Sequence, residues 1–418
     1  MIKKFSCDNF RNIRCSDLEF EKVNILIGPN NAGKSNFIRA LSFAANMVSN
    51  PKIDTTGFLS ELKRNGWNDV GRRDIECHSF RLNWTLELTK DMPVTYSLKA
   101  HIGKKREENY IAEEVLNSAI VKKGNDEPYN FFTCHGNTPG EGNFSTAGMD
   151  KVQNNRLKAK VAQDESVLLQ MDNLFFQNKN MFSTPFVRDS IRNVLDTMRT
   201  YFNGFYAYSC TSFDIFAIRE MQDELADGSM LLKTGLNFVN VFAYMNQVDS
   251  QFKERYLKML QRLLPECEDI YTKTAAGKIW AEMKMRGQVF QLSELSDGTI
   301  HLLVLILMLN LPREASISML AIDEPEMNLH PAWQKMLAKE ILRCSGVTQC
   351  FISTHSPDFL DEFTEGFLSG GVAIFVFDPS RRETIRKLSR NELKNDLEEW
   401  TLGDLYRVAD PMIGGWPQ

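Results

Sequence analysis

A glycine-rich loop near the N-terminus has the first residue pattern with a definite chemistry. Residues 28–35 read GPNNAGKS and match GxxxxGK[ST], between a β-rich apolar run at 23–27 and a helical pattern. Glycines let backbone N–H groups wrap closely around a phosphate, and a helix N-terminus attracts the anion. The flanking strand and helix favour this reading over an ordinary glycine turn. The candidate contact residues are Asn30, Asn31, Ala32, Gly33, Lys34, Ser35 and Asn36.

Lys34 would place its charge on the β- and γ-phosphates of a nucleotide, and the Ser35 hydroxyl can bind Mg²⁺. A pair of acidic residues suited to nucleotide hydrolysis lies at 323–324, where an apolar strand pattern (MLAI) ends in Asp-Glu. Asp323 would hold the Mg²⁺ shell, and Glu324 would position and polarise the attacking water. Paired acids can also be solvated turn residues, but the position downstream of a phosphate loop favours catalysis.

Two further segments have weaker signals when each is taken alone. Residues 295–299 read LSDGT before an aliphatic helix pattern, so Ser296 and Gly298 could present a hydroxyl and N–H groups to a phosphate. The alternative is an ordinary N-cap. Residues 353–357 read STHSP after a strand pattern, which places His355 at a strand end. A lone histidine there is more often structural, although this order along the chain suits contact with the γ-phosphate and the water.

The elements that must position these residues follow from periodicity. Alternation of apolar and polar side chains at 79–102 predicts antiparallel strands, and the segment 103–165 predicts hairpins with loops. Thr184 and Pro185 predict the start of a helix, and a second helix is expected to end at Pro265. A hairpin turning at Arg286 and Gly287 follows. Further helices (299–310, 331–344, 357–365) and strands (318–323, 347–353, 372–377) then alternate, which predicts parallel strands under helices.

Taken in order, the phosphate loop, LSDG, the strand ending in Asp-Glu and the strand ending in His resemble the heads of ABC ATPases. The opening IKKFSCDNFRNI, the variant signature ELSDGTIHLLVLILML, IDEPEMNLHP and STHSPDFL resemble the RecF, SMC and OLD-like group of prokaryotes, often labelled AAA-15 or AAA-21. The resemblance covers residues 1–45 and 288–365 most closely. It implies an α/β fold: a P-loop core with a parallel sheet, an antiparallel β subdomain and a helical insertion.

The same resemblance assigns roles and boundaries. ATP and Mg²⁺ are the implied ligands, Glu324 and His355 the catalytic residues, and Ser35 and Asp323 the metal ligands. Ser296 and Gly298 would bind the ATP of another protomer, and residues 328–330 would line the dimer interface. Arg11 and Asn12 are expected near the nucleotide, and Gln170 is a weak candidate for the glutamine loop. The expected parts are 1–170 and 278–418 for the head, with a helical lobe at 171–277.

Departures from the family pattern suggest the function. Only 63 residues follow His355, too few for the Toprim nuclease domain of OLD proteins, and the long coiled coil of SMC proteins is missing. We therefore expect an oligomeric ATPase without nuclease activity of its own, whose effector, a nuclease or toxin, is a separate protein. Such subunits are similar to the ATPases of anti-phage systems such as Septu and PARIS. A RecF-like repair ATPase that binds DNA across dimerised heads is the alternative, and an ATP-binding scaffold without useful turnover is a third.

Composition limits the alternatives further. A net charge of −5 argues against nucleic-acid binding over the whole surface, although basic strips at 151–160 and 381–387 leave local DNA contacts open. Interleaved acids favour a solvated surface for both strips. None of the eight cysteines forms a CxxC pair, which fits a reducing cytoplasm without zinc or disulfides. The longest aliphatic run, 302–309, is far short of the ~20 residues that span a bilayer.

Overall fold

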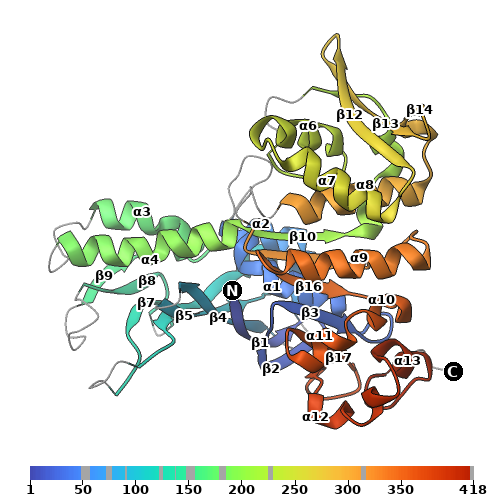
Figure 1. Cartoon of the computed structure of the whole chain (residues 1–418). Helices are drawn as coiled ribbons and strands as arrows, with labels where there is room; N and C mark the ends of the chain where they lie inside the picture. The colour runs from blue at the N-terminus through green and yellow to red at the C-terminus, as the bar shows by residue number, and fades with distance from the viewer. Residues whose placement is uncertain are drawn as a thin grey trace. The chain divides into compact units, whose positions relative to one another are not determined.

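The computed structural model describes residues 1–48, 57–71, 78–89, 92–121, 126–136, 138–146, 156–177, 185–224, 229–311 and 317–414 (Figure 1). The chain forms two compact units, each built from segments that are distant in sequence. Unit 1 consists of Met1–Phe20, Asn30–Phe205 and Phe377–Lys387, and unit 2 of Glu21–Pro29, Tyr206–Val376 and Leu388–Gln418. The chain crosses from unit 2 to unit 1 inside the predicted phosphate loop.

An eight-stranded antiparallel sheet dominates unit 1. Its strand order is β2-β1-β4-β5-β6-β7-β8-β9. Side chains of β4 and β5 alternate between buried and partly exposed, as expected for a sheet with one covered face. The predicted strands at 79–102, and the hairpins of 103–165 within the described residues, are confirmed. The strands are β1 (Ile2–Phe10), β2 (Ile13–Glu19), β4 (Ser79–Thr89), β5 (Met92–His101), β6 (Tyr110–Ser118), β7 (Asn130–His135), β8 (Glu141–Ser145) and β9 (Arg156–Lys160).

Helix α1 (Lys34–Val48) covers one face of this sheet. The indole Nε1 of Trp84 on β4 donates to the carbonyl oxygen of Leu41 at 3.1 Å, and the rings of Phe5 and Phe37 meet edge to face. Helix α4 starts at Pro185, as predicted, whereas Thr184 lies outside the described residues. The remaining elements of unit 1 are α2 (Phe58–Arg64), α3 (Val167–Gln177), α4 (Pro185–Asn203), η1 (Trp67–Val70), η2 (Arg106–Glu108) and β18 (Ile385–Lys387).

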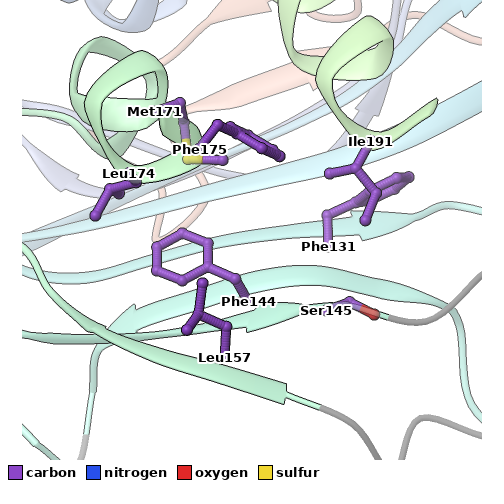
Figure 2. A pocket seen from close by; sticks show the side chains of 8 residues that line it. All are labelled: Phe131, Phe144, Ser145, Leu157, Met171, Leu174, Phe175 and Ile191. Atoms are coloured by element: carbon purple, nitrogen blue, oxygen red, sulfur yellow. The ribbon is translucent and has the colours of Figure 1, made fainter. Parts of the chain in front are cut away.

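A small cavity in unit 1 lies where α3 and α4 face the strands β7, β8 and β9 (Figure 2). Ser145 is its single polar lining residue, and its hydroxyl oxygen accepts a hydrogen bond from Tyr129 at 2.7 Å. A ligand site needs several convergent polar groups, so we regard this cavity as a packing feature of the core. The other lining residues are Phe131, Phe144, Leu157, Met171, Leu174, Phe175 and Ile191.

The strands of unit 2 lie side by side in the order β10-β15-β16-β3-β17. Strand β3 pairs in parallel with both β16 and β17, and β16 with β15, which confirms the predicted alternation of strands and helices. All residues of β3 and β16 are buried, as in a sheet covered on both faces. The strands are β3 (Val23–Ile27), β10 (Phe205–Ser209), β15 (Met319–Asp323), β16 (Gln349–Ser353) and β17 (Val372–Phe377).

Helix α8 (Asp297–Asn310) is buried along nearly its whole length, and the hydroxyl of Tyr256 donates to the Leu303 carbonyl oxygen at 2.8 Å. The predicted hairpin at 278–292 is present as β13 and β14. The other elements of unit 2 are α5 (Ile215–Arg219), α6 (Phe238–Val248), α7 (Phe252–Leu263), α9 (Pro331–Cys344), α10 (Pro357–Asp361), α11 (Thr364–Ser369), α12 (Arg390–Leu393), α13 (Leu402–Arg407), β11 (Gln222–Asp223), β12 (Cys267–Ala275), β13 (Lys278–Met285), β14 (Gln288–Gln291), η4 (Cys210–Ser212), η5 (Leu292–Glu294) and η7 (Asp396–Glu398).

One predicted helix is wrong in its extent. The pattern at 357–365 forms two helices, α10 and α11, which are interrupted at residues 362–363. The hydroxyl of Thr364 donates to the Asp361 carbonyl oxygen, a local contact that competes with helical pairing. The three-part division at 170 and 277 stays a prediction. None of the helices in the described residues combines the length and apolar character of a membrane span.

Candidate functional site

The glycine-rich loop connects β3 to α1 with a backbone that requires glycine. Gly28 and Gly33 have φ values of 144° and 108°, and Asn31 has a φ of 61°. A Cβ atom added to Gly33 would lie 2.9 Å from the Oδ1 atom of Asn12, closer than side chains tolerate. Both the positive φ angle and the lack of room for a Cβ atom therefore favour glycine at position 33.

Arg11 and Asn12 hold this loop from the turn between β1 and β2. The amide of Asn12 donates to the Asn31 carbonyl oxygen at 3.0 Å and accepts from the Asn36 amide at 2.8 Å. The guanidinium of Arg11 donates to Asn36 Oδ1 at 3.3 Å and to the Asn65 carbonyl oxygen at 2.8 Å. The structure thus places the two predicted residues against the loop itself. Their contact with a nucleotide stays a prediction, and the role of Asn65 was not predicted.

The first turn of α1 is suited to an anion. The helix begins at Lys34, which is buried, and its first turn contains no acidic residue. Ala32 is buried before it, whereas Ser35 is exposed and Asn30 belongs to the exposed start of the loop. The backbone dipoles of a 15-residue helix place partial positive charge at its N-terminus, so a phosphate would be stabilised here. The residues fit the predicted phosphate loop.

Three strand ends of unit 2 bring the predicted acidic and histidine groups together. In the parallel registers, Leu26 aligns with Ser353 and Ser353 aligns with Asp323, so β3, β16 and β15 end at the same edge. The hydroxyl of Ser353 donates a short hydrogen bond to Asp323 Oδ1 and accepts the Glu324 N–H at 3.1 Å. The carboxylate of Asp323 is therefore held in place by the end of β16, the strand that lies between β15 and β3.

Glu324 and His355 form a pair at this edge. Glu324 has a φ of 56°, a backbone region that non-glycine residues rarely adopt and that often marks functional sites. Its Oε1 atom lies 3.7 Å from Nε2 of His355, and the two side chains are 31% and 17% exposed. Both groups therefore remain reachable from solvent while facing each other. The sequence prediction that these residues act together fits this geometry.

Glu326 is a residue of this cluster that sequence reasoning missed. Its Oε1 atom accepts the His355 N–H at 2.7 Å and the Thr354 hydroxyl at 2.8 Å. Burial raises the pKa of Glu326, and these hydrogen bonds oppose that shift only in part. The carboxyl group thus links the turn after β15 to the segment that contains His355. A third acid three residues after Asp323 was the available signal.

The predicted signature segment begins α8. Ser296 is its N-cap, and the Oγ atom accepts the Thr299 N–H at 3.2 Å, so the capping alternative is confirmed. This geometry is compatible with a phosphate contact, which stays a prediction. A Cβ atom on Gly298 would lie 2.6 Å from the Asn328 carbonyl oxygen, so glycine permits a close approach of the turn before α9. His330, also predicted at an interface, is the N-cap of α9.

His301 fixes the relation between the signature segment and that turn. Its side chain is buried, with Nε2 at 3.2 Å from the Cys210 carbonyl oxygen and Nδ1 at 3.3 Å from Asn328 Nδ2. A neutral ring with its proton on Nε2 satisfies both contacts, and burial lowers the pKa of His301 accordingly. The sequence prediction did not include this residue.

Several residues with weaker predicted roles make local structural contacts. The Gln170 side chain bonds with backbone groups of Ala162 and Glu165, which makes it a local structural residue on α3. In the basic strips, Arg156 donates to Asn130 and Arg381 pairs with Asp378, while residue 151 lies outside the described residues. In the described part of the chain, no three His, Cys, Asp or Glu side chains form a group suited to a metal.

Comparison with known proteins identifies the family. The model of the AAA ATPase domain family AAA_15 matches residues 1–360. Endonuclease GajA of Bacillus cereus (strain VD045) is 24% identical over 375 residues, which cover 85% of this chain and 55% of that protein. The chain thus spans about half the length of this relative. A crystal structure of an SMC head bound to the C-winged helix domain of ScpA aligns with a TM-score of 0.55 at 13% identity, over 94% of this chain and 99% of that chain.

At this low sequence identity, the likeness to the SMC head shows the fold alone. The match to the family model shows the family to which the chain belongs. Both agree with the α/β architecture described above. The chain belongs to the AAA ATPase domain family AAA_15, and its fold is that of an ABC-type head similar to the SMC heads.

Proposed function

We propose that this chain hydrolyses ATP in composite sites made by two copies, and that hydrolysis controls a separate effector protein in prokaryotic anti-phage defence. The observation that carries the proposal is the shared strand edge of unit 2. There Asp323, Glu324 and His355 gather at the ends of β15 and β16, and the neighbouring β3 continues directly into the phosphate loop. Such strand ends are where open α/β sheets bind ligands.

The residues of the loop and of the strand ends would have separate roles in ATP binding and hydrolysis. Lys34 and the N–H groups at the start of α1 would bind the β- and γ-phosphates of ATP. Ser35 and Asp323 are the donors suited to Mg²⁺, which when bound neutralises charge on the phosphates. Glu324 would orient the attacking water and accept its proton, because its carboxylate is partly exposed and lies beside His355.

A second copy would complete each site. Ser296 and Gly298 begin a long helix, and an N-terminus of this kind can hold a γ-phosphate presented by another protomer. The resemblance to ABC heads supplies the expectation that this contact is made in trans. A dimer of heads is therefore the smallest active unit that we propose.

The effector part of the proposal rests on resemblance. The anti-phage ATPases to which the motifs are similar work with a nuclease or toxin on another chain. The relative GajA is called an endonuclease, and this chain spans 55% of it. We propose that this chain supplies the ATPase function and that a nuclease or toxin acts in trans, with DNA as a further candidate partner of the assembled complex.

Mixing of two inactive variants tests the composite site. Lys34→Ala should abolish ATP binding in its own half-site, and Ser296→Arg should block the half-site offered to a partner. Each variant alone should be inactive, but one of the two sites in a mixed dimer keeps both working halves. Partial recovery of phosphate release on mixing is expected. No recovery in a mixture whose subunits exchange, as shown by two different tags, would refute the trans assignment.

A further inference from the structure

An arginine outside every sequence motif contacts both sides of Ser296. Arg219 is the last residue of α5, and its Nη2 atom donates to the Leu295 carbonyl oxygen at 2.6 Å. The same nitrogen lies 2.7 Å from Oδ1 of Asp297. One guanidinium therefore binds the residue before Ser296 and the residue after it. Both contacts join segments of unit 2 that are far apart in the sequence.

The helix that carries this arginine is anchored. Asp214 is its N-cap and accepts the Ala217 N–H at 3.0 Å, and Ile218 is fully buried. The side chain of Arg219 is 23% exposed, whereas that of Asp297 is 62% exposed. The arginine is thus the fixed partner of the pair, and Asp297 is the group that faces solvent at the start of α8.

Asp297 creates an electrostatic conflict for the proposed phosphate contact. It is the acidic residue in the first turn of α8, where a carboxylate is favourable for the helix because the N-terminus carries partial positive charge. A phosphate brought to the same N-terminus would meet this carboxylate as a like charge. The paired guanidinium offsets the carboxylate charge and leaves the N-terminus attractive to an anion.

We propose that Arg219 is a positioning residue for the composite site, which neutralises Asp297 and orients the segment around Ser296 toward the phosphate of a second copy's ATP. This proposal rests on the trans assignment of Ser296 made above. Arg219 touches neither substrate nor water in it. Its effect is exerted through Asp297 and the Leu295 backbone, so it should change ATP-dependent assembly before it changes the chemical step.

The test measures ATP-dependent dimer formation in the Glu324→Gln variant, because that variant should retain ATP while hydrolysing it slowly. The ATP concentration that gives half-maximal dimer formation is measured by sedimentation velocity. Arg219→Ala in this background should raise that concentration about three- to fivefold, the size expected for a partly exposed ion pair. Lys258→Ala is the matched control, since Lys258 pairs with Glu254 on the exposed surface of α7.

A second substitution separates charge from packing. Asp297→Asn added to Arg219→Ala should restore the ATP requirement to within about twofold of the parent. A purely structural role of Arg219 predicts no such rescue, because Asn keeps the size of Asp297 and removes only its charge. Arg219→Lys, which keeps the charge without the forked donor, should lie between the parent and Arg219→Ala and guards against loss of folding.

Three outcomes would overturn the proposal, and only the last also overturns the proposed function. Assembly that responds to ATP but not to Arg219→Ala, or a defect that Asp297→Asn does not relieve, refutes the positioning role alone. Complete absence of ATP-dependent assembly in the Glu324→Gln parent refutes the composite site of the proposed function, and this inference falls with it.

Discussion

Replacement of Glu326 gives a quantitative test of how the histidine segment is held. Its Oε1 atom accepts the His355 N–H at 2.7 Å and the Thr354 hydroxyl at 2.8 Å. Hydrogen bonds to a charged group contribute roughly 1.5–3 kcal/mol each, and two that share one acceptor atom are not additive. Glu326→Ala should therefore lower the free energy of unfolding by roughly 2–4 kcal/mol.

The same substitution should reduce ATP turnover more than ATP affinity. Release of the His355 backbone changes the position of a ring that lies 3.7 Å from Glu324, whereas the phosphate loop is held by separate residues. We expect a fall in kcat of about tenfold or more, the effect of a small displacement in a catalytic group, with KM changed less than twofold. Glu326→Gln is the matched control, because its amide oxygen can still accept a hydrogen bond.

Urea unfolding and steady-state phosphate release are the two assays. The midpoint of the unfolding transition is the measured quantity, because a chain of two compact units need not unfold in one two-state transition. Glu326→Ala with an unchanged midpoint and an unchanged kcat would refute the reasoning. A fall in stability without any change in kcat would show that the carboxyl group supports the fold alone.

The raised pKa of Glu326 also sets a pH dependence with a definite sign. Its pKa in the folded protein lies above the usual value of 4.5, because burial disfavours the charged form. The folded state therefore keeps a proton that the unfolded chain has lost, and this residue favours folding most below pH 4.5. The contribution decreases as the pH rises through the folded pKa. Glu326→Gln should remove this part of the pH dependence.

The remaining predictions concern the phosphate loop, the catalytic carboxylate and the effector. Gly33→Ala should weaken ATP binding at least tenfold by calorimetry, because the new Cβ would lie 2.9 Å from Asn12 and the φ of 108° is unfavourable; unchanged affinity would contradict the loop geometry. Glu324→Gln should retain ATP binding while turnover falls ~10²–10⁴-fold, and full turnover would exclude it as the base. The purified chain should leave DNA and RNA intact with Mg²⁺ or Mn²⁺, and cleavage that survives Glu324→Gln would reveal a second active site.

Much of the fold could be read from short-range patterns. Alternation at 79–102 predicted paired antiparallel strands, and the apolar runs before Gly28 and through Asp323 predicted buried parallel strands, all of which the structure contains. Such patterns are informative because side-chain burial repeats with the period of the element itself. The error at 357–365 arose where apolar spacing continued through a turn at residues 362–363, beside which the Thr364 hydroxyl donates to the Asp361 carbonyl oxygen.

The candidate site was predictable where its residues follow strand ends. Parallel strands end at one edge of a sheet, so Asp323, Glu324 and His355 could be expected near each other from element order alone. The loop sequence similarly specified glycine at position 33, although the cause became visible only with Asn12 packed against it. The capping role of Ser296 was also among the alternatives that the sequence offered, and the structure confirms it.

The sequence by itself determined which residues are the candidates for binding phosphate, ligating a metal ion and activating water, because such predictions depend on residue type and on spacing within one element. The tertiary structure alone decided the supporting contacts. Arg219 meets Asp297 across 78 positions, and Glu326 meets His355 across 29, as the difference of their residue numbers shows. No local period links such pairs, since the chain between them folds through helices and strands whose packing brings the two partners within hydrogen-bonding distance.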